Sequence, residues 1–293
     1  DPRGIQALES LYPFTGSAHI VGITGPPGVG KSSLTAAAIA KVRAGDRRIA
    51  VLAIDPTSPV SGGAVLGDRV RMMDFHADND VFIRSMASRG RHGGLAWTTA
   101  ELVHLLDAAG FPLIVIETVG TGQDSTDIAH LADTVVVVEA PGLGDGIQAI
   151  KSGLLEVGDV VVVNKADHPG ASDALRSLRG ALADGSLAGS GFPRILGTDA
   201  LTGKGVDSLV HAIDEHARWL NDSGERERRR ERGIRAEVLA GVRARLARRM
   251  DSGPSGSPEL AHLLKQVQLR KITPRRAIET IVGTADCLSG RGS

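Results

Sequence analysis

Short runs rich in β-branched residues alternate with longer segments of helical period between residues 19 and 220. Strands separated by helix-length connections are typical of a mostly parallel sheet whose two faces are covered by helices. We therefore predict an α/β fold with strands at 19–24, 48–55, 81–84, 113–118, 134–140, 160–165 and 194–198. The connecting helices are predicted at 31–44, 95–109, 125–132, 172–182 and 206–220.

The β pattern stops after Asn221, and the following segment predicts a long charged helix. Ile234, Val238, Val242 and Leu246 stand four residues apart on one face of that helix. Such an apolar stripe requires a partner surface. The arginines of the helix alternate with glutamates, which favours a solvated or dimer-forming helix over an RNA-binding one.

A break rich in Gly, Ser and Pro at 251–258 precedes two more predicted helices. One lies near 259–269, and the other starts at Thr273, an N-cap that is followed by Pro274 at the first helical position. We therefore expect three parts, namely a lead-in at 1–18, an α/β domain at 19–220, and a helical appendage, suited to a dimer arm, at 221–293.

Composition excludes several classes of protein. Of the 293 residues, 42% are hydrophobic, which is enough for a large core. Lys and Arg total 34, as do Asp and Glu, so no net charge attracts nucleic acid or anionic lipid. The single cysteine, Cys287, excludes an intrachain disulfide and a cysteine-rich zinc cluster. Because no apolar run reaches membrane-spanning length, we expect a soluble cytoplasmic protein with no nucleic-acid or membrane partner.

The sequence GPPGVGKS at 25–32 fits the Walker A pattern and stands between an apolar strand and an amphipathic helix. Glycines in such a loop let backbone N–H groups point at phosphate oxygens, while the helix N-terminus adds positive potential. We expect Lys31 to neutralise the β- and γ-phosphates and Ser32 to bind magnesium. The alternative is a glycine-rich turn without a ligand. The expected nucleotide contacts are Gly25, Pro26, Pro27, Gly28, Val29, Gly30, Lys31, Ser32 and Ser33. Together these features predict a P-loop NTPase.

Guanine selectivity is predicted by VVVVNKAD at 160–167, an NKxD pattern directly after an apolar strand. The carboxylate of Asp167 can accept hydrogen bonds from guanine N1–H and the 2-amino group, neither of which adenine has. Lys165 is expected to lay its stem along the base, and Asn164 to join loops. A polar turn at the strand end is the alternative. The loop expected at the guanine carbonyl contains Thr198 and Ala200, which partly match the usual Ser-Ala pair.

A further phosphate-side element is predicted at 113–120, where Glu117 ends a strand and Gly120 follows. We expect Glu117 to act as an outer-sphere magnesium ligand and the Gly120 N–H to reach the γ-phosphate. A solvated strand-end carboxylate is the alternative for Glu117. Thr121 stands where many GTPases have a water-orienting glutamine, and the nearest glutamine is Gln123. We therefore expect slow hydrolysis by the isolated protein.

The chain resembles the MeaB/ArgK family, GTPases related to the human MMAA protein that serve adenosylcobalamin-dependent acyl-CoA mutases. Besides the general GTPase motifs, the resemblance rests on IDPTSPVSGGAVLGDRVRM at 54–72, IETVGTGQD at 116–124, PGLGDGIQAIKSG at 141–153 and VVVNKAD at 161–167. It spans roughly residues 16–220. The resemblance implies a chaperone that uses GTP, GDP and Mg²⁺ to regulate cofactor loading or protection of such a mutase, and a homodimer with a helical arm.

The same resemblance implies that Asp55 and Asp68 join Ser32 and Glu117 around magnesium. Two such carboxylates beside Ser32 also make physical sense only if a divalent cation offsets their repulsion, although Asp68 alone could equally be a helix cap. The family's signalling segment corresponds to 141–153, with a lysine at the position of Lys151.

Lys151 and Arg71 are candidate catalytic residues together with Lys31, Glu117 and Gln123, although a surface Lys or Arg is more often a solvated charge. SMASRGRHGG at 85–94, Asp124 and the unusual guanine-carbonyl loop depart from the family pattern and leave the identity of the mutase open.

Two other functions remain alternatives. A metallochaperone GTPase that delivers nickel or a similar ion would need a Cys/His cluster near the nucleotide, and the single cysteine argues against it. A transport-linked kinase or ATPase, which the family's older LAO/AO name implies, would pass the γ-phosphate to a protein, but the sequence shows no separate phosphoacceptor site.

Overall fold

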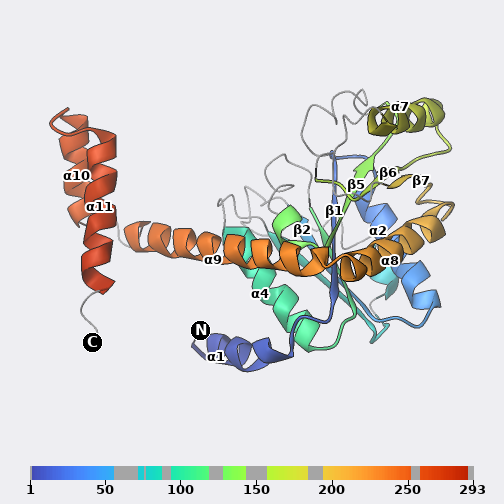
Figure 1. The fold of residues 1–293 in the computed structure, drawn as a ribbon, viewed down its shortest axis with the longest axis horizontal. Coiled ribbons are helices and arrows are strands. Elements are labelled where there is room, and N and C mark those ends of the chain that lie inside the picture. Colours follow the sequence, from blue (N-terminus) through green and yellow to red (C-terminus); the bar gives the residue numbers. More distant parts are fainter. Residues whose placement is uncertain are drawn as a thin grey trace. The chain divides into compact units, whose positions relative to one another are not determined.

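The computed structural model describes residues 2–55, 72–75, 77–87, 94–118, 128–142, 157–183, 194–251 and 258–289. The chain divides into two compact units, Asp1–Val238 and Leu239–Ser293. The larger unit contains a sheet with helices on both faces (Figure 1). In the described ranges, none of the helices combines the length and the apolar character that crossing a membrane takes.

All strands of the sheet run parallel, and their spatial order is β3-β2-β4-β1-β5-β6-β7. The predicted α/β fold is confirmed, with strands at β1 (His19–Thr24), β2 (Ile49–Asp55), β3 (Val81–Ala87), β4 (Leu113–Glu117), β5 (Thr134–Glu139), β6 (Val160–Val163) and β7 (Arg194–Gly197). The chain moves to one side of β1 for β2 to β4 and to the other side for β5 to β7. Ligands of open α/β sheets bind at the carboxyl ends of strands beside such a reversal.

The larger unit contains the helices α1 (Pro2–Leu11), α2 (Lys31–Ala44), α4 (Gly94–Ala108), α7 (Ala171–Ala183) and α8 (Val206–Asp222), with short 3-10 turns at Tyr12–Phe14 and Met73–Phe75. Residues 128–131 are also helical, while 125–127 of the predicted helix lie outside the described residues. The buried side chains of α2 and α8 pack on one face of the sheet, and those of α4 and α7 pack on the other. Both faces of the central strands are therefore covered.

The hydrophobic core explains the unbroken valine runs of the sequence. Alternate residues of β5 point to opposite faces, with Val136 and Val138 toward α2 and α8 and Val135 and Val137 toward α7. All four are buried. Burial of one such side chain contributes roughly 1.5–3 kcal/mol, so a strand covered on both faces gains from every residue.

The smaller unit contains the end of α9 (Glu225–Asp251), α10 (Pro258–Gln268) and α11 (Pro274–Ser289). Leu263 of α10 and Ala277 of α11 are its buried apolar residues within the described part. The Thr273 hydroxyl accepts a hydrogen bond of 3.2 Å from the Arg276 N–H, so the predicted N-cap is present. Residues 252–257 of the predicted break lie outside the described residues.

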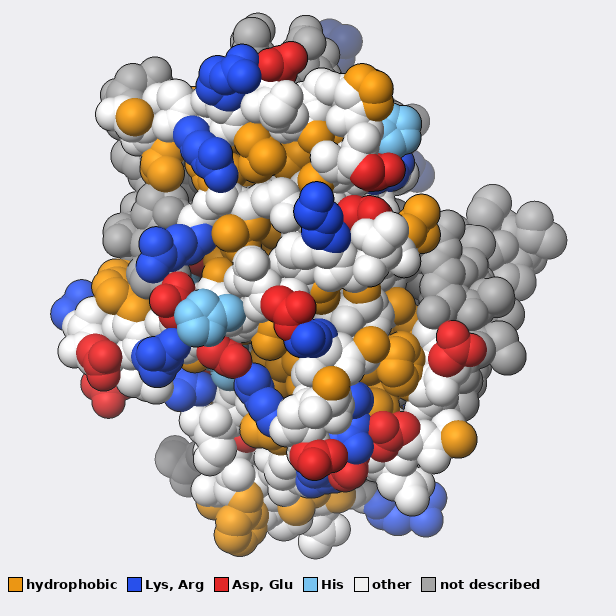
Figure 2. Space-filling view, turned by 90° about the vertical axis from the view of Figure 1, so that its right-hand side faces the viewer, with side chains coloured by type: hydrophobic (Ala, Val, Ile, Leu, Met, Phe, Trp, Pro, Cys, Tyr) orange, Lys and Arg blue, Asp and Glu red, His pale blue; other side chains and the backbone are white. Residues whose placement is uncertain are grey.

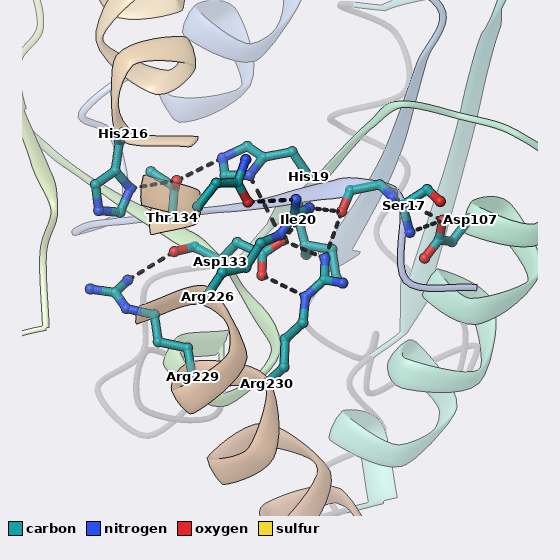
Figure 3. Close-up of polar contacts among 12 residues, drawn as sticks. Ser17, His19, Ile20, Asp107, Asp133, Thr134, His216, Arg226, Arg229 and Arg230 are labelled. Carbon is teal, nitrogen blue, oxygen red and sulfur yellow. Dashed lines mark hydrogen bonds and ion pairs between the residues drawn. The ribbon is translucent and has the colours of Figure 1, made fainter. Parts of the chain in front are cut away.

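The first turns of α9 are fixed to the amino ends of the strands by buried ion pairs (Figure 3). Arg229 donates two hydrogen bonds of 2.8 Å to the fully buried carboxylate of Asp159, just before β6. Arg230 binds Asp133, just before β5, at 3.1 and 3.2 Å. The expectation that this helix is solvated or dimer-forming is therefore incomplete, because these arginines pair with carboxylates of the sheet domain.

A histidine pair continues this cluster across the sheet. The Thr134 hydroxyl lies 2.8 Å from His19 Nε2 and 2.7 Å from His216 Nδ1. Burial lowers the pKa of each histidine from 6.5 to about 4, against the opposing charge of Asp133 beside His19 and of Asp159 beside His216. Both imidazoles are therefore neutral at pH 7. With one proton on its hydroxyl, Thr134 donates to one imidazole and accepts from the other.

Charged side chains of both signs are interspersed over the face drawn in Figure 2. Lysines and arginines do not gather there into a single basic patch, and this mixing matches the formal net charge of zero.

Candidate functional site

The Walker A loop joins β1 to α2 through glycines that no other residue could replace without distortion. Gly25 and Gly30 have φ angles of 144° and 92°. A Cβ at Gly25 would lie 2.0 Å from the carbonyl oxygen of Val138, and one at Gly30 would lie 2.5 Å from Asn164 Nδ2. The loop is therefore pressed against β5 and against the loop after β6. Of its other members, Val29 is buried, Pro26, Gly30 and Ser33 are half-buried, and Pro27 and Gly28 are exposed.

Lys31 begins α2 and is buried, with its ammonium turned back on the loop. Nζ donates hydrogen bonds to the carbonyl oxygens of Gly25 at 2.8 Å and Pro26 at 2.9 Å. The next residue, Ser32, donates a hydrogen bond of 2.6 Å from its hydroxyl to Glu117 Oε1. This contact is possible because β1 and β4 are neighbours, with Ile23 opposite Glu117. The structure thus brings together the predicted phosphate-binding lysine and two predicted magnesium ligands.

The donor chemistry at this point fits magnesium. A serine hydroxyl and a carboxylate are hard oxygen donors of the kind that Mg²⁺ takes in nucleotide sites. The backbone of Asp55 ends β2, opposite Ala87, but its side chain is outside the described part. The remaining phosphate-side predictions also lie outside the described residues, namely Asp68, Arg71, Gly120, Gln123 and Lys151.

Asn164 connects the predicted base site to the Walker A loop. Its side-chain amide donates to the carbonyl oxygen of Val29 at 2.9 Å. Its Oδ1 accepts hydrogen bonds of 3.1 Å from the Thr198 hydroxyl and from the Ala200 N–H. Because Asn164 and Thr198 are both buried, these bonds are shielded from water. The backbone N–H of Ala200 can reach a guanine carbonyl only by sharing or exchanging this hydrogen bond.

Lys165 and Asp167 have different environments. Lys165 adopts a left-handed backbone conformation with φ of 57°, and its ammonium donates to the carbonyl oxygen of Gly28 at 2.9 Å. Asp167 is exposed, as a side chain that meets a ligand from solvent requires. The NKxD residues therefore join β6 to the Walker A loop and leave one carboxylate accessible.

Two acidic residues of the site have roles that the sequence did not predict, although Asp199 lies in the expected guanine-carbonyl loop. Asp199 orders the guanine-carbonyl loop, since its carboxylate accepts hydrogen bonds from the Thr202 hydroxyl and from the Leu201 N–H. The Thr202 hydroxyl is the main cause that lowers the pKa of Asp199. Glu139 ends β5, where burial raises its pKa to about 7 against the opposing charge of Lys31. The signal for Glu139 was a single charged residue at the end of a valine run.

Comparison with known proteins agrees with this geometry. Residues 3–255 match the family model described as methylmalonyl Co-A mutase-associated GTPase MeaB. A putative GTPase of Pyrococcus horikoshii is 44% identical over 283 residues, which cover 94% of this chain and 88% of the relative. The mitochondrial methylmalonic aciduria type A homolog of Caenorhabditis elegans is 31% identical over 90% of this chain and 67% of its own length.

The fold also matches a solved structure. A LAO/AO transport system kinase superimposes with a TM-score of 0.68 and 26% sequence identity, over 96% of this chain and 86% of that one. The chain is thus a P-loop GTPase whose family binds guanine nucleotides. With a family match over most of its length and relatives well above 30% identity, it belongs to the MeaB family of methylmalonyl-CoA mutase-associated GTPases.

Proposed function

We propose that this protein binds and hydrolyses GTP with Mg²⁺ and thereby regulates cofactor loading or protection of an adenosylcobalamin-dependent acyl-CoA mutase. The observation that carries the magnesium-dependent chemistry is the 2.6 Å hydrogen bond between Ser32 and Glu117, next to the buried Lys31. The mutase partner is supported by the family match and by the name of the methylmalonic aciduria type A homolog.

In this proposal the phosphate site works by charge. Lys31 exchanges the carbonyl oxygens of Gly25 and Pro26 for phosphate oxygens, and the N–H groups at the start of α2 point at the same anion. Ser32 and Glu117, with Asp55 and Asp68, would hold the magnesium ion. When bound, that ion neutralises charge that builds up on the transferred phosphate. Gly120 and Gln123 are the proposed residues for the γ-phosphate and the attacking water, with Arg71 and Lys151 as further catalytic candidates.

The base site is proposed to select guanine through Asp167, whose exposed carboxylate accepts from N1–H and the 2-amino group. Lys165 contributes its stem to the face of the base, while its ammonium is held by Gly28. Asn164 keeps Thr198 and Ala200 at a fixed distance from the Walker A loop. Phosphate and base subsites are therefore held together by the same buried amide.

We further propose that the helical appendage at 221–293 forms a homodimer. Ile234, Val238 and Val242 are 50%, 60% and 50% exposed on α9, which is unusual for three apolar side chains four residues apart. A second copy with the same stripe would cover them. Val238→Glu should then convert the dimer to a monomer in analytical ultracentrifugation, and a dimer that persists in this variant contradicts the proposed interface.

The regulatory role is tested by co-purification. The protein is incubated with an adenosylcobalamin-dependent acyl-CoA mutase in GDP or in a non-hydrolysable GTP analogue, with the Lys31→Ala variant as the control. We expect the retained fraction to differ between the two nucleotides and to lose that difference in the variant. Equal or absent retention in both nucleotides would contradict regulation of the mutase.

A further inference from the structure

Glu139 stands where β5 meets the Walker A loop. Thr24, the last residue of β1, pairs with Val137 of β5, and the chain at Gly25 lies against the carbonyl of Val138. Glu139 is therefore beside the first turn of the loop, on the opposite side of β1 from Glu117. On the other flank, the carbonyl oxygen of Glu139 accepts a hydrogen bond of 2.8 Å from the N–H of Asn164.

The carboxylate of Glu139 is poorly solvated. Its Oε1 is buried and has no hydrogen-bond partner among the residues that the structure describes. Within the described part of the chain, Lys31 of α2 is the charged group that acts on it, and the ammonium of Lys31 is already bound to two carbonyl oxygens. The ammonium of Lys165, in the loop after β6, donates a hydrogen bond to the carbonyl oxygen of Gly28. An ionised Glu139 thus depends on a lysine that the proposed function assigns to phosphate.

Entry of a nucleotide changes this balance. Phosphate oxygens would take over the positive charge of Lys31 and would add negative charge close to Glu139. Both effects disfavour the carboxylate relative to the neutral acid. Burial already holds the pKa of Glu139 near 7, so its carboxyl group is partly ionised in the free protein at neutral pH. A further rise of this pKa on nucleotide binding therefore causes the group to take up protons.

We infer that Glu139 takes up a proton from solvent when the phosphates of a guanine nucleotide enter the Walker A loop, so that nucleotide affinity is linked to pH. This inference rests on the proposed assignment of Lys31 to phosphate. The proton goes from the buffer to the Glu139 carboxylate, and no other bond is made or broken. Glu139 is in this sense a positioning residue, because its neutral form leaves Lys31 wholly to the nucleotide.

The direction of the pH effect follows from linkage. Below about pH 7 Glu139 is mostly protonated with or without nucleotide, and its contribution to affinity is constant. Above that pH, binding must recruit a proton, so affinity falls as pH rises until the pKa of the nucleotide-bound form is passed. One linked proton limits the fall to about tenfold per pH unit.

The test is isothermal titration calorimetry of the full chain with GDP and fixed magnesium, at about pH 7.5, in buffers of different ionisation enthalpy. Glu139→Gln carries a permanently neutral side chain, and Glu227→Gln, on an exposed position of α9, is the matched control. Protons of GDP itself contribute equally in all three proteins. We expect the unmodified protein and Glu227→Gln to take up more protons than Glu139→Gln. Equal uptake in all three proteins would overturn the inference.

Two further measurements separate the possible failures. If Lys31→Ala binds GDP as tightly as the unmodified protein, the phosphate assignment itself is wrong. If Lys31→Ala binds weakly but Glu139→Gln shows the same fall in affinity above pH 7 as the unmodified protein, only the role of Glu139 is wrong. If Glu139→Gln does not fold, the carboxyl ¹³C resonances of the isotope-labelled unmodified protein provide the test instead. One glutamate must then titrate near pH 7 and shift upward with GDP, and a spectrum without such a glutamate overturns the inference.

Discussion

Asn164 is the residue on which the two halves of the nucleotide site depend most. Its side chain makes three buried hydrogen bonds, to Val29, Thr198 and Ala200. Asn164→Ala leaves these groups without partners, so we expect a loss of about 2–3 kcal/mol in the free energy of unfolding. GDP affinity should fall by about tenfold or more. Asn221→Ala, at an exposed position of α8, is the control and should change both quantities little. Equal denaturation midpoints for the two variants would contradict this role.

Asp167 is expected to decide base identity. In Asp167→Asn the carboxylate becomes an amide that can donate to the 2-oxo group of xanthine, where a carboxylate repels it. We therefore predict that the variant prefers xanthosine over guanosine diphosphate, with little change in stability because the residue is exposed. Competition binding with the two nucleotides measures the preference. Retention of guanine preference in the variant would remove Asp167 from the base site.

At the scale of elements, α9 is held by a buried bidentate ion pair. Arg229→Ala leaves the carboxylate of Asp159 buried beside His216 without its main partner. Loss of one partner of a buried pair typically costs about 3–5 kcal/mol. Arg228→Ala, on the same turn, removes an exposed pair with Glu225, which is worth about 0–1 kcal/mol. Chemical denaturation should separate the two variants clearly, and similar stabilities would show that the buried pair does not anchor the helix.

The two buried histidines predict sensitivity to acid. The pKa of both His19 and His216 is lowered from 6.5 to about 4, so the unfolded chain binds more protons between these values. The contribution of the two histidines to stability should be constant above about pH 6.5 and should fall by a few kcal/mol as the pH decreases to 4, and the raised pKa of Glu139 offsets part of this fall. His216→Gln should show a smaller fall, although it is less stable at pH 7, whereas the exposed His211→Gln should show the same fall as the unmodified protein. An unchanged fall in His216→Gln would contradict this account.

Regular elements could be predicted from sequence because their signals are local. The predicted bounds 19–24 and 31–44 coincide with β1 and α2. β3 continues to Ala87 beyond its predicted end at 84, since it pairs with β2 as far as Asp55. Its length is set by a neighbouring strand, which the residues of β3 do not encode.

Contacts between distant residues account for most of what the sequence left open. Asp133 and Asp159 each precede a valine run, which is visible in the sequence. No local pattern predicts their partners, Arg230 and Arg229, which lie 97 and 70 residues further along the chain. Burial alone would raise the pKa of Asp133, yet the hydrogen bond and charge of Arg230 keep it below its usual value. Burial raises the pKa of Glu139, and the opposing charge comes from Lys31, far away in sequence.

At the scale of the molecule, the sheet has two functional ends. The carboxyl ends of β1, β4, β5 and β6 contribute the Walker A loop, Glu117, Glu139 and Asn164. The amino ends of β5 and β6 contribute the carboxylates that hold α9. The nucleotide-site residues and the carboxylates that hold the first turns of α9 are thus placed at opposite ends of the strands of one sheet.

In the proposed function, a mutase and the nucleotide act on each other through this protein. The most direct measurement is the GTP hydrolysis rate with and without a saturating adenosylcobalamin-dependent acyl-CoA mutase, with Lys31→Ala as the inactive control. Because Thr121 occupies the place of a water-orienting glutamine, we predict slow hydrolysis alone and a rise of about tenfold or more with the mutase. A rate that the mutase leaves unchanged, in a protein that binds GTP and magnesium, would rule out this coupling between mutase and nucleotide.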